Sequence, residues 1–383
     1  MKISKDIVYV GVNDYDLDLF EGQFITPNGM AYNSYVILDE KIAVMDSVGY
    51  EFGDQWIENV KAATDGKEPD YLVIQHMEPD HSANMVDFLK AFPNAKIVSS
   101  KKAFGMMSQF FGDDFADKQV VVGEGDTLEL GSHTLNFIGA AMVHWPEVIM
   151  TYESTDKVLF SADGFGKFGA TDADEDWACE ARRYYFGIVG KYGQQVQAVL
   201  KKAANLDIQV ICPLHGPVLN EDLGYYIGLY DTWSSYKPET EGVFIAYTSV
   251  YGNTKKAVDM LQEKLEAKGI TVSVSDLARE DWAEAIEDAF RYDRVVFATT
   301  TYNNDVFPFT KTLLEHLAVR GYQNRKIGII ENSTWAPAVA KNVKKMLEGG
   351  KDIVFCDTVV SIKSAMNDEN VAQIEQLAEE LAQ

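Results

Sequence analysis

Short apolar runs separated by polar turns fill the first 164 positions and recur near residue 210, which predicts a strand-rich region. The predicted strands occupy 7–12, 34–38, 42–46, 71–74, 96–99, 120–122, 127–130, 134–138, 148–152, 157–160 and 209–212. Helical periodicity is expected over 52–63, from His81 onward, and over 101–111 and 184–204. Two strand-forming halves with flanking helices indicate a layered α/β sandwich, with helices outside and two sheets within.

The pattern changes after the polar stretch 234–241, where we place a boundary between domains 1–238 and 239–383. Beyond it, apolar strands are predicted at 243–248, 271–276, 294–300, 326–331 and 353–360. Helices are predicted between and after them, at 254–268, 282–290, 308–320, 337–348 and 368–382. Five strands alternating with five helices are typical of a doubly wound parallel sheet.

Composition narrows the class of protein. The chain has 383 residues, 46% of them hydrophobic, and a formal charge of −25, which argues against a nucleic-acid partner because phosphates require a basic surface. Its three cysteines, Cys179, Cys212 and Cys356, form no C-x-x-C pair, which excludes a disulfide framework and a fused rubredoxin or iron–sulfur module. No apolar leader or membrane-spanning run is visible, so we expect a cytoplasmic protein without a membrane partner.

One six-residue run, His76-Met77-Glu78-Pro79-Asp80-His81, holds four potential metal ligands directly after a predicted buried strand. Pro79 opposes a helix through the run, so we expect an extended loop that presents alternate side chains on one side. The other interpretation is a solvated acidic loop with incidental histidines. The chain has only six histidines, which makes two of them among carboxylates five positions apart an improbable accident.

Three further candidates, His144, Asp163 and His215, each follow a strand-like run. With the first run they make four histidines and three carboxylates, which are too many for one ion and suit two ions with a bridging carboxylate. Zinc hydrolase sites favour imidazole-rich ligation, whereas mixed carboxylate–imidazole shells suit iron or manganese. We predict iron. His133 and His316 match no motif position and are expected at the surface.

The spacing His76-x-Glu78-x-Asp80-His81, followed by His144, Asp163 and His215, resembles the metallo-β-lactamase superfamily. More specifically it resembles the flavodiiron proteins, in which a glutamate replaces the second histidine of the hydrolase motif. The resemblance implies an N-terminal αββα metallo-β-lactamase-like sandwich followed by a flavodoxin-like sheet. It further implies one iron held by His76, Glu78 and His144, a second held by Asp80, His81 and His215, and Asp163 as the bridge.

Three loops at the carboxyl ends of C-terminal strands are predicted to bind FMN, because ligands bind doubly wound sheets at this rim. The first is rich in hydroxyls and precedes a helix, as a phosphate cradle requires. The predicted contacts are Thr248, Ser249, Val250, Tyr251, Gly252, Asn253 and Thr254, then Thr300, Thr301, Tyr302, Asn303 and Asn304, then Asn332, Ser333, Thr334 and Trp335. A G-x-G-x-x-G match at 164–169 is discarded because no helix signal follows it.

By this resemblance the chain reduces dioxygen to water, nitric oxide to nitrous oxide, or both, at a non-haem diiron site. Electrons are expected through FMN from a separate rubredoxin or a reduced deazaflavin cofactor. A head-to-tail homodimer, or a dimer of dimers, would set the FMN of one subunit against the irons of the other. Two other hypotheses are a zinc hydrolase of the metallo-β-lactamase type with an accessory flavodoxin domain, and a flavin-binding electron carrier whose N-terminal domain is a scaffold.

Overall fold

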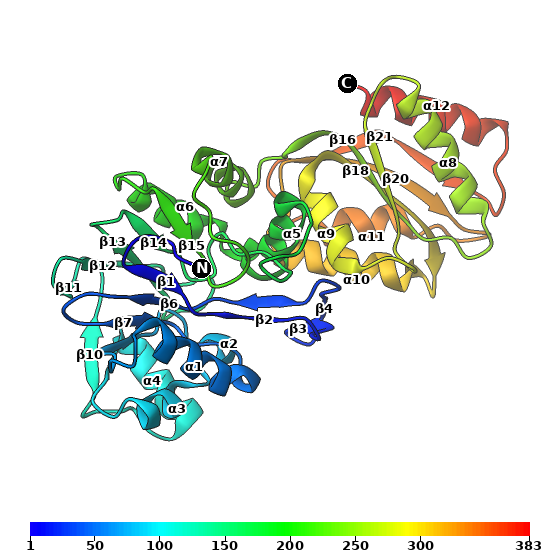
Figure 1. The fold of residues 1–383 in the computed structure, drawn as a ribbon. Helices are drawn as coiled ribbons and strands as arrows, with labels where there is room; N and C mark the ends of the chain where they lie inside the picture. Colours follow the sequence, from blue (N-terminus) through cyan, green and yellow to red (C-terminus); the bar gives the residue numbers. More distant parts are fainter. The chain divides into compact units, whose positions relative to one another are not determined.

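A computed structural model describes residues 1–383, and the chain forms two compact units (Figure 1). The first unit comprises Met1–Tyr185 and Gln194–Asp231, and the second comprises Phe186–Gly193 and Thr232–Gln383. The chain thus leaves the first unit, contributes a short segment to the second, and returns. The predicted domain boundary after residue 238 stays a prediction.

Two sheets form the first unit. The first has the order β1-β6-β7-β8-β9-β10, with strands β1 (Ile7–Tyr9), β6 (Tyr35–Ile37), β7 (Ala43–Met45), β8 (Tyr71–Val73), β9 (Lys96–Ser100) and β10 (Gln119–Val122). The second runs in chain order through β11 (Thr127–Glu129), β12 (Thr134–Gly139), β13 (Ile149–Glu153), β14 (Val158–Phe160) and β15 (Val210–Cys212). Two small hairpin-like pairs join β2 (Val12–Asp14) with β5 (Met30–Tyr32) and β3 (Leu19–Phe20) with β4 (Phe24–Ile25).

A shared apolar core lies between these two sheets. Tyr35 and Val98 of the first sheet and Phe137, Phe160 and Cys212 of the second belong to one cluster of buried side chains. Helices α1–α4 lie against the outer side of the first sheet, and α6 lies by the second (Figure 1). This is the layered sandwich that the sequence predicts.

Seven α-helices lie between residues 53 and 234, and two of them, α4 and α5, begin with a side-chain cap. Their bounds are α1 (Gly53–Ala63), α2 (Pro79–Ser82), α3 (Met85–Ala91), α4 (Lys101–Phe111), α5 (Trp177–Tyr184), α6 (Gly193–Ala203) and α7 (Leu223–Ser234). Short 3₁₀ segments lie at Tyr50–Phe52 and Gly190–Tyr192, and Tyr185–Val189 is a π-helical turn. In α4, the side chain of Ser100 accepts a hydrogen bond from the Ala103 amide, and Gly112 ends the helix with φ of 70°.

Two local predictions need correction. Pro79 does not exclude a helix from the ligand run: it begins α2, because proline at the first helical position loses no intrahelical hydrogen bond. Asp80 and His81 therefore lie on a helical turn. The α-helix predicted over 184–204 begins only at Gly193, because Tyr185–Val189 is a π-helical turn and Gly190–Tyr192 is a 3₁₀ segment; α5 precedes that range and was not predicted.

The second unit is the predicted doubly wound sheet. Its order is β17-β16-β18-β20-β21, all parallel, with β16 (Thr240–Tyr247), β17 (Val272–Asp276), β18 (Tyr292–Tyr302), β20 (Arg325–Asn332) and β21 (Ile353–Ile362). The helices are α8 (Asn253–Glu266), α9 (Trp282–Arg291), α10 (Pro308–Val319), α11 (Val339–Met346) and α12 (Asp368–Leu381). A short antiparallel strand, β19 (Asp305–Val306), pairs with β18 and was not predicted. None of the chain's helices is long and apolar enough to span a lipid bilayer.

Candidate metal centre and ligand pocket

The first unit brings together all seven side chains that the sequence singles out as metal ligands. They form two groups whose potential ligand atoms lie within 4.8 Å of one another: His76, Glu78, His144 and Asp163 in the first, and Asp80, His81 and His215 in the second. His76 and Glu78 follow β8, His144 follows β12, Asp163 follows β14 and His215 follows β15. Strand ends from both sheets thus meet at one edge of the sandwich.

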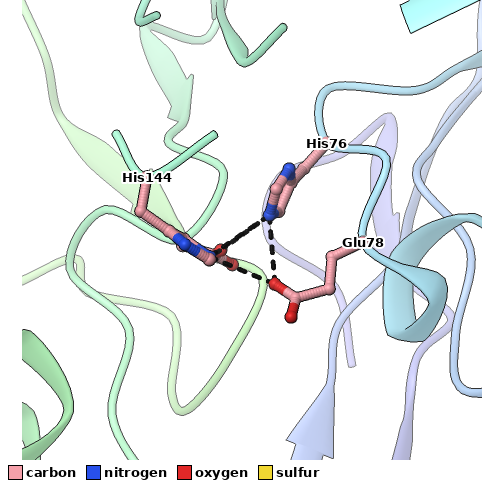
Figure 2. Close-up of side chains that lie close together, drawn as sticks. His76, Glu78 and His144 are labelled. Atoms are coloured by element: carbon pink, nitrogen blue, oxygen red, sulfur yellow. Dashed lines mark hydrogen bonds and ion pairs between the residues drawn. The ribbon is translucent and has the colours of Figure 1, made fainter. Parts of the chain in front are cut away.

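In the first group, two imidazoles and a carboxylate point at a common position (Figure 2). Oε2 of Glu78 lies 3.2 Å from Nε2 of His76 and 3.1 Å from Nε2 of His144, and the two nitrogens are 3.3 Å apart. Oδ2 of Asp163 completes the group, at 3.3 Å from His76 and 3.1 Å from His144. Four donor atoms therefore surround a space of the size that one metal ion occupies.

The second group repeats this convergence with the other oxygen of the same aspartate. The Nε2 atoms of His81 and His215 are 3.0 Å apart, and Oδ2 of Asp80 lies 3.2 Å and 3.3 Å from them. Oδ1 of Asp163 is 3.3 Å from His81 and 3.7 Å from His215. Asp163 therefore turns one oxygen to each group, as a carboxylate bridging two ions would.

Hydrogen-bond acceptors outside the centre fix the tautomers of His76 and His215. Nδ1 of His76 lies 2.8 Å from Oε1 of Glu147, and Nδ1 of His215 lies 2.7 Å from the carbonyl oxygen of Ala31. A carbonyl or carboxylate oxygen only accepts, so each Nδ1 carries the proton and each neutral ring presents a bare Nε2 to the centre. Glu147 is buried and also accepts the Met77 amide, which holds the ligand run in place.

The carboxylate oxygens of Asp80 and Asp163 face imidazole nitrogens of the two groups and form no well-directed hydrogen bond. Both carboxylate oxygens of Asp80 and of Asp163 accept no hydrogen bond, although Asp163 is only 1% exposed. Buried carboxylates are costly unless a cation neutralises them, and either protonated imidazoles or metal ions do so. When the imidazoles are neutral, their lone pairs and the carboxylate oxygens form the donor set that a pair of metal ions requires.

The ligand run is anchored at both ends by buried residues that follow β7. Asp46 accepts hydrogen bonds from the Gln75 amide at 2.7 Å and from the Gln75 side chain at 2.9 Å. The amide and the hydroxyl of Ser47 both donate to the carbonyl oxygen of His81, at 2.8 Å each. These contacts fix the position of the run before any ion binds, which lowers the cost of assembling the site.

Electrostatics couple the histidines to the carboxylates. Burial by itself would lower the pKa of His144, and the carboxylates of Asp163 and Glu78 outweigh it and raise that pKa to about 9. The pKa of buried His76 and His81 is likewise raised against the effect of burial, through Asp163 and the other carboxylates. The metal-free centre therefore retains protons on imidazole near neutral pH.

Binding of ferrous ions is expected to release protons. Ligating imidazoles must be neutral, and His144 with a raised pKa is protonated at pH 7 in the metal-free protein, so each binding event displaces protons. Affinity should consequently rise between pH 6 and pH 9. Anaerobic calorimetric titrations at pH 7 in two buffers of different ionisation enthalpy measure the number released. An identical heat in both buffers would contradict this prediction.

Glu147 was not singled out from the sequence, and its only local signal is a carboxylate three residues after His144. The substitution Glu147→Gln is expected to weaken metal retention by about 10–100-fold, because the acceptor that orients His76 is replaced by a weaker partner. Iron content after dialysis against graded chelator measures this. Glu58→Gln, at an exposed position on α1, is the matched control. Equal iron retention in both variants would show that Glu147 does not support the centre.

The second unit has a cavity of about 560 Å³ at the carboxyl ends of β16, β18 and β20. Fourteen of the sixteen predicted FMN contacts line it: Ser249, Val250, Tyr251, Asn253, Thr254, Thr300, Thr301, Tyr302, Asn303, Asn304, Asn332, Ser333, Thr334 and Trp335. Ala336 and Ser364 also line it and were not predicted; Ser364 follows β21, a strand whose following loop the sequence analysis did not consider. Thr248 and Gly252 are outside the lining.

The two exceptions shape the first loop. Thr248 is buried and its hydroxyl lies 2.5 Å from that of Thr299, so it ties β16 to β18. Gly252 precedes α8 with φ of 85°, a conformation that a side chain disfavours. Ser249 accepts hydrogen bonds from the amides of Gly252 and Lys255, at 3.1 Å and 3.2 Å. This turn delivers the loop to the N-terminus of a long helix, where an anion is stabilised.

The structure also tests two predictions about residues outside the metal centre and the cavity, namely His133 and the glycine-rich match at 164–169. The prediction that His133 lies at the surface is wrong, because the residue is 2% exposed. Its position before β12 in a tight turn gave no apolar pattern that would indicate burial. The G-x-G-x-x-G match at 164–169 is followed by no helix until α5 begins at Trp177, so the strand–turn–helix context of a dinucleotide site is absent.

Comparisons with known proteins cover both units. A family model described as "ODP family beta lactamase" matches residues 30–216, which include all seven candidate ligands. A model described as "Flavodoxin domain" matches residues 244–350, which include the three predicted loops. A nitric oxide reductase from Moorella thermoacetica is 28% identical, over 99% of this chain and 97% of its own.

Two solved structures share the whole fold. The rubredoxin oxygen:oxidoreductase from Desulfovibrio gigas superposes with a TM-score of 0.90 at 28% identity, covering 100% of this chain and 97% of that one. The flavodiiron protein from Giardia intestinalis superposes with a TM-score of 0.92 at 26% identity, covering 99% of this chain and 95% of that one. The αββα sandwich followed by a flavodoxin-like sheet is thereby confirmed.

Proposed function

Because this chain belongs to the flavodiiron protein family and is an oxidoreductase, we propose that it reduces dioxygen to water, nitric oxide to nitrous oxide, or both. The observation that carries the proposal is the placement of Asp163, whose two oxygens each face a separate group of donor atoms. Such a carboxylate suits two adjacent ions that act on one small molecule.

The bound groups and the protein have separate tasks. Two iron ions and FMN, when bound, would supply the redox chemistry, since neither histidine nor carboxylate side chains exchange electrons in this way. His76, Glu78 and His144 would hold one ion, Asp80, His81 and His215 the other, and Asp163 would bridge them. These assignments rest on the donor geometry and on the glutamate at position 78, because a mixed carboxylate–imidazole shell favours iron over zinc.

Residues beside the ligands keep the centre shielded from solvent. Trp145 packs edge-on against His76 at 5.2 Å and His144 at 6.0 Å between ring centroids. On the other side, Tyr184 lies 5.5 Å from the ring of His215 and is itself buried. Apolar walls suit a small gas, which needs no polar recognition, and they restrict the access of bulk water.

Loops after β16, β18 and β20 would bind FMN, with its phosphate at the N-terminus of α8. Tyr302 and Trp335, 50% and 86% exposed at the cavity, would pack beside the flavin ring. We propose rubredoxin or a reduced deazaflavin as the electron donor, and a head-to-tail homodimer that sets FMN against the metal centre. The Desulfovibrio gigas protein is named for its use of rubredoxin, which supports the first of these donors.

The zinc hydrolase and the scaffold hypotheses make different predictions for one variant. His144→Ala in iron- and FMN-loaded protein should abolish consumption of both gases under steady-state reduction, with FMN content unchanged. If the N-terminal unit were a scaffold, gas consumption would be the same in the variant and the wild type. If the chain were a hydrolase, the wild type would retain zinc, cleave esters and consume neither gas.

A further inference from the structure

A second cluster of metal-ligating side chains lies away from the centre described above. One ligand atom from each of His133, Glu153 and Asp156 lies within 4.8 Å of the others. His133 ends the turn that precedes β12, Glu153 is the last residue of β13, and Asp156 lies in the turn between β13 and β14. Neither the resemblance to flavodiiron proteins nor the sequence motifs assign a role to these residues.

Burial and missing partners distinguish this cluster from an ordinary acidic turn. His133 is 2% exposed and Glu153 is fully buried. Nδ1 of His133 points at Oε1 of Glu153 from 3.1 Å, yet it takes part in no hydrogen bond, and neither does the buried Oδ2 of Asp156. Glu153 is thus the ion-pair partner of this imidazole nitrogen, whereas the buried Oδ2 of Asp156 has no partner, and a cation among the three side chains would satisfy both.

The carboxylate of Glu153 retains the capacity to bind a cation. Its Oε1 accepts the amide of Thr155 at 2.6 Å, and its Oε2 accepts the amide of Asp156 at 2.7 Å. Each carboxylate oxygen has two lone pairs, so these bonds orient the group and leave one acceptor site on each oxygen. On the far side of the imidazole, Oδ2 of Asp6 lies 3.8 Å from Nε2 of His133 and adds negative charge near the ring.

Strand direction separates this cluster from the main centre. β12 runs from His133 toward the loop of His144, and β13 returns antiparallel to it and ends at Glu153. β14 then leads from the Asp156 turn toward Asp163. The two clusters therefore lie at opposite ends of one sheet, about 17 Å apart for a strand of five residues. They cannot share a ligand.

We propose that His133, Glu153 and Asp156 bind a first-row divalent cation, with Nδ1 of His133 and one oxygen from each carboxylate as ligands. One imidazole and two carboxylates suit zinc and its neighbours, and in a tetrahedral site the ligand atoms are about 3.4 Å apart, close to the 3.1 Å between His133 and Glu153. The ion would join the ends of β12, β13 and β14. Its role would be structural, because all three ligands come from the ends and turns of neighbouring strands of one sheet.

Cobalt(II) is the probe, because its visible absorption reports nitrogen–oxygen ligation. Iron-loaded protein, kept anaerobic, is titrated with CoCl₂, and bound cobalt and retained iron are counted by elemental analysis. We expect one equivalent of cobalt per chain beyond the ions of the main centre, with the iron content unchanged. Asp156→Asn should weaken this uptake at least tenfold, and His133→Gln should abolish it. His316→Gln, at the remaining histidine outside both clusters, is the matched control.

The Asp156→Asn variant should fold normally, because Asp156 is only partly buried and its Oδ2 makes no hydrogen bond, so a loss of uptake in this variant cannot be ascribed to misfolding. Zinc should raise the melting temperature of the wild type and of His316→Gln, and not that of Asp156→Asn. The proposal is overturned if the wild type takes up no additional cobalt, or if Asp156→Asn and His133→Gln both take up as much as the wild type. Loss of iron or of gas reduction alone would bear on the main centre and not on this site.

Discussion

Asp163→Asn is expected to lose most of both metal ions and to reduce gas consumption by at least about 100-fold. Replacing a residue that only orients a ligand costs about 10–100-fold in metal affinity or activity, and Asp163 contacts both groups of donors directly. An amide has the same shape and cannot supply a negative oxygen to each side. The amide nitrogen of the new asparagine would donate hydrogen bonds to the ligand atoms of one group, which stabilises that group without a metal ion.

Iron content per chain and steady-state gas consumption measure the effect, with FMN content as the internal reference. Asp174→Asn, at an exposed position of the loop before α5, is the matched control and should keep its iron. The central role of Asp163 would be refuted if the variant retained two irons per chain and consumed either gas at the wild-type rate. Loss of FMN together with iron would point instead to global misfolding.

Ser249→Asp is expected to lower FMN affinity by about 100-fold and leave the iron content unchanged. A carboxylate beside the FMN phosphate sets two like charges about 5 Å apart, which costs ~2–3 kcal/mol in a partly solvated site. The fold should tolerate the change, because an aspartate can accept the amide hydrogen bonds of Gly252 and Lys255 that Ser249 accepts. A negative charge also stabilises the N-terminus of α8 when no phosphate is bound.

Fluorescence titration of the FMN-free protein with FMN gives the affinity, and donor-driven turnover should fall with flavin occupancy. Ser249→Ala removes the hydroxyl without adding charge and should bind FMN within about tenfold of the wild type. Equal FMN affinity for Ser249→Asp and Ser249→Ala would place the phosphate elsewhere in the cavity. Saturating FMN should restore turnover in Ser249→Asp, since the metal centre is intact.

The C-terminal sheet could be predicted closely because its inner strands β16, β18 and β20 contain apolar runs that are buried on both faces, whereas the edge strands β17 and β21 are only partly buried. The parallel direction of the strands follows from their alternation with helices, whereas the order β17-β16-β18-β20-β21 was not predicted. The short strand β19 was missed because two residues carry no periodicity. In the N-terminal unit, α5 was missed because its buried positions include Arg182 and Arg183, which read as solvent-exposed in a pattern of apolar residues.

The metal centre could be predicted because its ligands are uncommon residue types at the ends of apolar runs. The supporting residues could not, since their roles depend on contacts between distant segments: Glu147 reaches back 71 positions to His76. The prediction for His133 was wrong for the same reason. Its burial depends on neighbouring turns and on Asp39, whose carboxylate accepts a hydrogen bond from the His133 amide. The type of a side chain indicates which chemistry it can perform, whereas the fold determines which other side chains it contacts.

Mössbauer spectroscopy of ⁵⁷Fe-loaded protein, recorded after anaerobic reduction and again after brief exposure to dioxygen, tests the central claim most directly. Two ions that share Asp163 are predicted to be ferrous at first and then to become a ferric pair with a coupled, diamagnetic ground state. A single iron per chain, two magnetically independent ferric ions, or ferrous ions that dioxygen leaves unchanged would each contradict the account.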